Sequence, residues 1–151
     1  SGCIAVSGGL EVASPRVLQL INKGITIDIA SETMKNLTES GIMTHAYLMY
    51  GFPTETAKET IESLEVVRGL FEKGWLQSAF WHRYAMTIHS PSDTVGAKSL
   101  QNKPNSFANN EIPFSTPHEI DLDFYGKGLN LATYNYMNGA GYDIEVKKWF
   151  N

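Results

Sequence analysis

Two hydrophobic patterns alternate along the first ninety residues. Short apolar runs, rich in aromatic and β-branched residues, predict strands at residues 3–6, 42–50 and 76–87. Between them, apolar residues three and four positions apart predict helices over 27–40 and 57–73. Strands that alternate with helices favour a parallel sheet with right-handed crossovers, so we expect an α/β fold.

Polar residues and glycines mark the ends of the predicted helices. Ser14 and Pro15 have the types preferred at the N-cap and first position of a helix, which adds a short helix after the first strand. Thr56 and Glu59 have the spacing of a capping box, in which each side chain bonds the other residue's backbone N–H. A glycine of the kind that suits the residue after a helix follows each of these three helices: Gly24, Gly41 and Gly74.

The pattern changes near residue 92. A short helix is predicted at 93–99, a longer one at 122–138, and a last short helix that Asp143 would cap. The segment between the first two is rich in Asn, Pro and Ser, which is typical of irregular surface structure. We therefore divide the chain into a strand–helix part (1–91) and a loop-rich, helical C-terminal extension that packs on it (92–151).

The predicted sheet is too small to be complete. Three parallel strands cannot close a barrel, and an open sheet presents unpaired backbone groups at its edges. The sequence also begins almost inside the first predicted strand. We expect the chain to be part of a larger sheet, completed either by a missing N-terminal half or by a homo-oligomer that pairs the open edges.

Composition narrows the possible partners and compartment. The 151 residues carry a net charge of −4 without a run of Lys or Arg, which argues against nucleic-acid or anionic-membrane binding. No apolar run is long enough to span a bilayer and no signal-peptide pattern is seen, so we expect a cytoplasmic protein. Cys3, the only cysteine, cannot form an intrachain disulfide or hold a zinc or iron–sulfur centre alone.

The stretch around which the chain is organised is the end of the second predicted strand. Its apolar run finishes in Gly51-Phe52-Pro53, and a helix begins at once. Gly51 lets a ligand or another backbone come close, because it has no Cβ, and Pro53 ends the strand. In α/β proteins ligands bind at this corner, where a strand's carboxyl end meets a helix N-terminus.

Three segments together resemble radical S-adenosylmethionine (radical SAM) enzymes. GGLEVAS at residues 8–14, with the RVL and NKG that follow it, resembles the "GLESGSxRVLxxMNKG" run of that superfamily. YLMYGFPTET at 47–56 resembles its "GFPGET" segment, and FWHRY with TIHSP (80–91) resembles the next strand in the branch that often has a cobalamin-binding domain. The segments occur in the family order over about ninety residues.

The resemblance implies a fold and a chemistry. The fold is the carboxyl-terminal half of a six-stranded partial (β/α) barrel. In such enzymes a 4Fe-4S cluster, held by a CxxxCxxC loop after the first strand, reduces S-adenosylmethionine (SAM), and the resulting radical abstracts a substrate hydrogen. This chain lacks that loop. The resemblance therefore implies a fragment of an iron–sulfur oxidoreductase-like enzyme that is inactive alone, with the cluster, and possible use of cobalamin, belonging to the full-length parent.

The resemblance also assigns candidate site residues. Glu11 matches an acidic position whose carboxylate would bond the amino group or ribose hydroxyls of SAM. Tyr50, Gly51 and Phe52 match the turn beside the adenine, where backbone groups read the base edge. Substrate-facing candidates, near the end of the third strand, are Arg83 and His89. Thr54 stands where the family usually has glycine.

Each assignment has a structural alternative. Glu11 is either a ligand-binding carboxylate or a charge near a helix start, and Glu55 better fits a first-turn helix carboxylate. The side chains of Tyr50 and Phe52 suit the core, which leaves the turn backbone for the ligand. Arg83 would otherwise pair with a carboxylate. The histidines have no metal-ligand spacing, and we assign no catalytic residue.

Two function hypotheses from other classes stay open. A non-catalytic α/β module would reuse half a barrel for interaction or structure. An ordinary β/α-barrel enzyme of different chemistry is disfavoured, because the sequence lacks catalytic dyads and lysine–carboxylate constellations.

Overall fold

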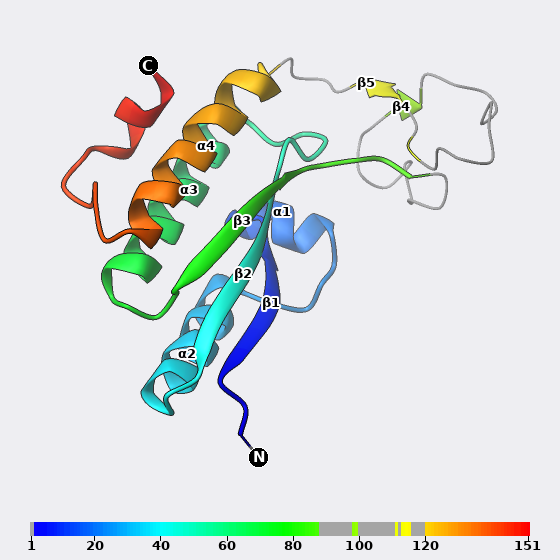
Figure 1. Ribbon diagram of the computed structural model, residues 1–151. Coiled ribbons are helices and arrows are strands. Elements are labelled where there is room, and N and C mark those ends of the chain that lie inside the picture. Colours follow the sequence, from blue (N-terminus) through cyan, green and yellow to red (C-terminus); the bar gives the residue numbers. More distant parts are fainter. Residues whose placement is uncertain (1, 88–97, 100–110, 112, 116–119) are drawn as a thin grey trace.

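The computed structural model describes the chain except residues 1, 88–97, 100–110, 112 and 116–119 (Figure 1). Its main sheet has three parallel strands in the order β1-β2-β3, which are β1 (Ala5–Glu11), β2 (Met43–Tyr50) and β3 (Ser78–Arg83). The helices are α1 (Pro15–Leu20), α2 (Ile27–Glu39), α3 (Ala57–Glu72), α4 (Leu122–Met137) and the 3-10 helix η2 (Val146–Phe150). The predicted α/β fold with an open parallel sheet is confirmed.

Most local signals form the helix ends as predicted, but the assignment of Gly24 as the residue after the first helix is wrong, because α1 ends at Leu20 with Ile21 as its C-cap. The Ser14 hydroxyl accepts the Val17 N–H at the start of α1, and the capping box of Thr56 and Glu59 is complete at the start of α3. Gly41 and Gly74 follow α2 and α3 with φ of 76° and 70°, in the left-handed region that glycine adopts without strain.

Strand β2 shows why one face of the sheet is covered. Thr44, Ala46, Leu48 and Tyr50 are buried, whereas the alternate residues are exposed or half-buried. Successive side chains of a strand point to opposite faces, so the buried set faces the helices. Contacts of α2 with β2 and of α4 with β3 place these helices on that face (Figure 1). We call the opposite face the open face.

The open face is defined by the residues paired across the strands. Three pairs of β2 and β3 lie on it, His45 with Ser78, Tyr47 with Phe80, and Met49 with His82. On β1, the positions paired with His45 and Tyr47 are the small Ser7 and Gly9.

Helix α4 packs closely on the sheet and on η2 because it carries two glycines. A Cβ on Gly126 would lie 2.3 Å from the Tyr50 hydroxyl, and one on Gly128 would lie 2.5 Å from the Phe150 ring. Glycine lowers helix propensity, but here it makes room for aromatic side chains. The Trp81 indole N–H also donates to Thr133 on α4, at 2.8 Å.

A second small core covers the carboxyl end of the sheet. It consists of Val12, Val17, Phe52 and Met86, with Tyr84 and Phe114 among the partly buried residues around it. The ring of Tyr84 makes edge contacts with Phe52, at 5.0 Å between centroids, and with Phe114, at 5.4 Å.

Several boundary predictions differ from the structure. The first strand covers Ala5–Glu11 instead of residues 3–6, so Gly8 and Gly9 lie inside it and not after it. The third strand ends at Arg83 instead of continuing to 87. Residues 98 and 99 form β4 (Lys98–Ser99), which pairs antiparallel with β5 (Phe114–Ser115), so the end of the helix predicted at 93–99 is wrong; its other residues lie outside the described part. Glu145, not Asp143, occupies the N-cap of η2 and makes no side-chain cap bond there.

Candidate functional site

The turn after β2 folds around a buried carboxylate. The Glu55 side chain is 2% exposed, and one of its oxygens accepts the Phe52 N–H at 3.0 Å. The other accepts the Thr60 hydroxyl at 3.0 Å, while the Glu55 N–H donates to the Phe52 carbonyl at 2.8 Å. Burial raises the pKa of Glu55 above its ordinary value. Glu55 thus shapes the turn from inside.

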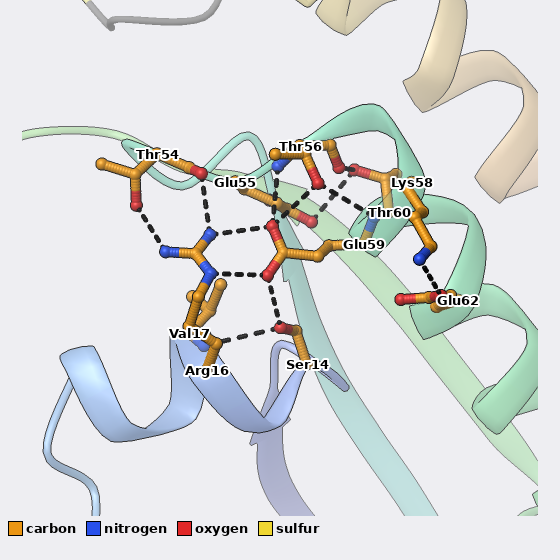
Figure 2. Close-up of polar contacts among 10 residues, drawn as sticks. All are labelled: Ser14, Arg16, Val17, Thr54, Glu55, Thr56, Lys58, Glu59, Thr60 and Glu62. Carbon is orange, nitrogen blue, oxygen red and sulfur yellow. Dashed lines mark hydrogen bonds and ion pairs between the residues drawn. The ribbon is translucent and has the colours of Figure 1, made fainter.

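A charged cluster joins this turn to α1 (Figure 2). The Arg16 guanidinium donates from Nε to Glu59 Oε1 at 2.7 Å and from Nη2 to Oε2 at 2.8 Å, which is a bidentate pair. Ser14 Oγ also donates to Glu59, at 3.1 Å. Chiefly through the Arg16 hydrogen bonds, the pKa of Glu59 is lowered to about 2. We call Ser14, Arg16, Thr54 and Glu59 the Arg16 clasp.

The clasp also holds a residue with unusual backbone geometry. Thr54 has a φ of 72°, which non-glycine residues rarely adopt. Arg16 donates to its hydroxyl at 3.1 Å and to its carbonyl at 2.8 Å. The left-handed φ explains why glycine suits this position, and the clasp explains how threonine is accommodated here.

Glu11 lies at the end of β1, where the strand register shifts between Gly9 and Glu11. The φ of Glu11 is 59°. Its carboxylate folds back over the preceding residues of β1, since a Cβ on Gly9 would lie 2.5 Å from Glu11 Oε1. Gly9 pairs with Tyr47, so the carboxylate lies over the open face. It accepts from Lys23 Nζ at 2.7 Å, and the two side chains are 22% and 53% exposed. A carboxylate and an ammonium group are thus accessible together.

The candidate residues of the turn lie mostly inside the protein. Tyr50 is 8% and Phe52 4% exposed, and burial raises the pKa of the Tyr50 phenol. A Cβ on Gly51 would lie 2.7 Å from Leu122 at the start of α4. Tyr50 and Phe52 therefore act as core side chains. The backbone of the turn is also bonded within the protein: the Phe52 N–H and carbonyl bond Glu55, and the Tyr50 carbonyl accepts the Tyr84 N–H.

The two substrate-facing candidates are placed differently. Arg83 follows the buried Trp81 on the helix-facing side of β3, and its Nη1 pairs with Asp123 of α4 at 3.2 Å. Both side chains of this pair are more than half exposed, at 56% and 83%. His89 lies outside the described residues. The structure thus joins Glu11 to Lys23, and Arg83 to a carboxylate of the extension.

Sequence reasoning missed two features. One is the Arg16 clasp, in which Arg16 and Glu59 are 43 positions apart. Its only signals in the sequence were the arginine in the first family-like segment and, separately, the glutamate of the capping box. The other is a group of rings on the open face, formed by His45, Tyr47, Phe80 and His82. Strict alternation along the second and third strands was the signal for it.

Two searches of the described residues gave negative results. In that part of the chain, no helix has both the length and the apolar character needed to cross a membrane. Nor do three or more His, Cys, Asp or Glu residues gather there in a way that would hold a metal ion.

Comparison with known proteins gives partial similarities. The chain is 35% identical over 69 residues to an uncharacterized methyltransferase of Pyrococcus horikoshii, covering 46% of the chain and 15% of that protein. It is 34% identical over 68 residues to the anaerobic magnesium-protoporphyrin IX monomethyl ester cyclase of Rubrivivax gelatinosus, which covers 45% of the chain and 12% of that cyclase. It is also 33% identical over 70 residues to an uncharacterized protein of Methanopyrus kandleri, which covers 46% of the chain and 13% of that protein. No protein-family model matches the chain.

These similarities span less than a sixth of each relative's length. They relate the chain, over less than half of its own length, to proteins named as a methyltransferase and as a cyclase.

Proposed function

We propose that this chain forms the carboxyl-terminal half of a radical SAM partial barrel and supplies binding surface for SAM and for the substrate. The single observation that carries the proposal is the placement of Glu11. Its carboxylate is folded over Gly9 at the carboxyl end of a parallel strand, on the face that the helices leave open. Ligands of α/β proteins bind at this end of the strands.

Glu11 has the chemistry that the ligand requires. A carboxylate accepts hydrogen bonds from an amino group or from ribose hydroxyls, and such charge-assisted bonds are the stronger ones. Its partner Lys23 is 53% exposed, so it can move aside or bind a ligand carboxylate when the site fills. The similarity to proteins named as an uncharacterized methyltransferase and as an anaerobic magnesium-protoporphyrin IX monomethyl ester cyclase supports a SAM-dependent role.

The residues present do not fit an iron–sulfur cluster. Cys3 is the only cysteine of the chain, and it is exposed. In this proposal the cluster belongs to an N-terminal half that pairs with β1, and the present chain alone is inactive.

Two experiments test the proposal. Sequencing the gene upstream of the codon for Ser1 should show an in-frame CxxxCxxC within about a hundred residues, the length of half a barrel of this type. Calorimetric titration of the complete protein with SAM should give about tenfold weaker binding for Glu11→Gln, which removes a charged hydrogen bond.

Glu62→Gln is the matched control for Glu11→Gln. Glu62 also pairs with a lysine, Lys58 at 3.6 Å, but on the exposed side of α3 (Figure 2). Its SAM affinity should equal that of the wild type. Equal affinities of all three proteins would remove Glu11 from the site, and an upstream sequence without the cysteine triad would favour a non-catalytic interaction module.

A further inference from the structure

The open face carries a continuous group of four rings, which we call the ring layer: His45, Tyr47, Phe80 and His82. Tyr47 lies at its centre, 4.9 Å from the His45 ring and 5.8 Å from the His82 ring between centroids. Phe80 contacts His82 at 4.6 Å. Two of these contacts are T-shaped, with the edge of one ring toward the face of the other at interplanar angles of 78° and 61°, and the third is tilted at 39°, so the rings form a surface instead of a closed stack.

The ring layer is large and accessible. Tyr47 is 47% and Phe80 51% exposed, although each belongs to a parallel strand. Parallel sheets are normally covered on both faces, and in the described part of the chain α2 and α4 pack on the other face. An exposed aromatic patch of this kind marks a binding surface.

The chemistry of the face limits what it binds. The ten strand positions that alternate onto this face carry no formal charge: Ala5, Ser7, Gly9, Met43, His45, Tyr47, Met49, Ser78, Phe80 and His82. The Glu11 carboxylate that lies over Gly9 is paired with the ammonium group of Lys23. His45 Nδ1 is 2.7 Å from Ser78 Oγ, which orients the ring and leaves Nε2 for another partner. Aromatic faces surrounded by imidazole and phenol groups suit a flat, uncharged π system with polar atoms at its edge.

The shape of the face supports the same ligand. On strand β1, the residues paired with Tyr47 and His45 are the small Gly9 and Ser7. The Glu11 carboxylate lies over Gly9, next to Tyr47 in the sheet. A ligand on the ring layer would therefore lie directly beside the proposed SAM site.

We infer that the ring layer binds the planar conjugated ring system of the substrate, stacked on Tyr47 and Phe80 with its edge toward the imidazoles of His45 and His82. The inference rests on the proposed function, because it assigns the substrate surface beside Glu11. It names the substrate by class, a flat conjugated ring, and places it on residues distinct from Arg83.

The test uses riboflavin as a flat, uncharged probe and octyl glucoside, below its micellar concentration, as an apolar probe that is not flat. In the complete protein, with carbon-13 in its histidine and tyrosine rings, riboflavin should produce saturable ring-current shifts at His45, Tyr47 and His82. Tyr47→Leu combined with Phe80→Leu keeps the face apolar but should weaken riboflavin binding about tenfold, as expected for two lost stacking contacts.

The chain offers a matched control on another element. Phe124→Leu combined with Tyr134→Leu removes two rings of α4 that are 41% and 64% exposed. This variant should bind riboflavin as the wild type does. Equal riboflavin affinity of both double variants, or equally tight binding of octyl glucoside at the same resonances, would overturn the inference.

The outcomes separate this inference from the proposed function. SAM binding that depends on Glu11, without riboflavin shifts at the ring layer, would overturn the inference alone. Riboflavin shifts without SAM binding would support the ring site and overturn the proposed function. If Tyr47→Leu with Phe80→Leu turned a dimer into a monomer in light scattering and riboflavin did not bind, the face would be an interface between copies, and the inference would fail.

Discussion

The bidentate pair between Arg16 and Glu59 should stabilise the fold in a way that depends on pH. Glu59→Gln isolates this effect, because glutamine keeps the shape of the side chain and can serve at the same position of a capping box. The substitution removes the charge that faces the guanidinium and turns one acceptor oxygen into an NH2 donor, so the bidentate pair with Arg16 is lost as well. The lost charge matters only at a pH where Glu59 is ionised, so the pH-dependent part of the difference reports the electrostatic part of the Arg16 clasp.

The size of the effect follows from the pKa of Glu59. A carboxyl pKa lowered from 4.5 to about 2 corresponds to about 3 kcal/mol of stabilisation at neutral pH. Arg16 is 46% exposed, and solvent screening reduces the figure to about 1 to 2 kcal/mol. Because the folded-state pKa lies below the unfolded one, this stability is complete above pH 4.5 and is lost as the pH falls toward 2.

The assay is urea denaturation of both proteins at pH 7, 5 and 3, followed by circular dichroism. Glu59→Gln should lower the free energy of unfolding by about 1 to 2 kcal/mol at pH 7, and the difference should fall to less than half by pH 3. Glu62→Gln breaks an exposed pair and should cost less than about 0.5 kcal/mol. A loss for Glu59→Gln that is the same at pH 7 and pH 3, or no larger than that of Glu62→Gln, would refute the reasoning.

Two further predictions concern the turn and α4. Burial raises the pKa of Glu55, so the free energy of unfolding of the wild type should fall as the pH rises from 4.5 through the folded-state pKa. Glu55→Gln has no charge to bury, so its stability relative to the wild type should increase over that range. Thermal melts measure both proteins, and a stability difference that does not change with pH would contradict this prediction. Gly126→Ala should cost about 1 to 3 kcal/mol, because its Cβ would meet the Tyr50 hydroxyl at 2.3 Å. The control is Gly69→Ala in α3, whose Cβ would meet nothing within 4 Å and which should stabilise the protein by about 0.5 to 1 kcal/mol. Urea denaturation gives the free energy of unfolding of both variants, and a similar loss of stability in both would exclude the steric explanation for Gly126→Ala.

The candidate site could be predicted only in part. The strand, turn and helix around Gly51 were predictable, because each depends on residues a few positions apart. The position of Glu11 over Gly9 was not, since it requires a register shift and a φ of 59° that no local pattern indicates. Which side of β3 carries Arg83 depended on where the strand pairs with β2.

By itself, the sequence determined the order of the elements, their caps and the alternation that divides each strand into two faces. These features arise from backbone sterics, short-range hydrogen bonds and the spacing of apolar residues. Only the tertiary structure decided which residues meet across the crossovers, such as Arg16 with Glu59 and Trp81 with Thr133, 52 positions apart. Such pairs depend on how helices and strands pack, and packing is a property of the whole core.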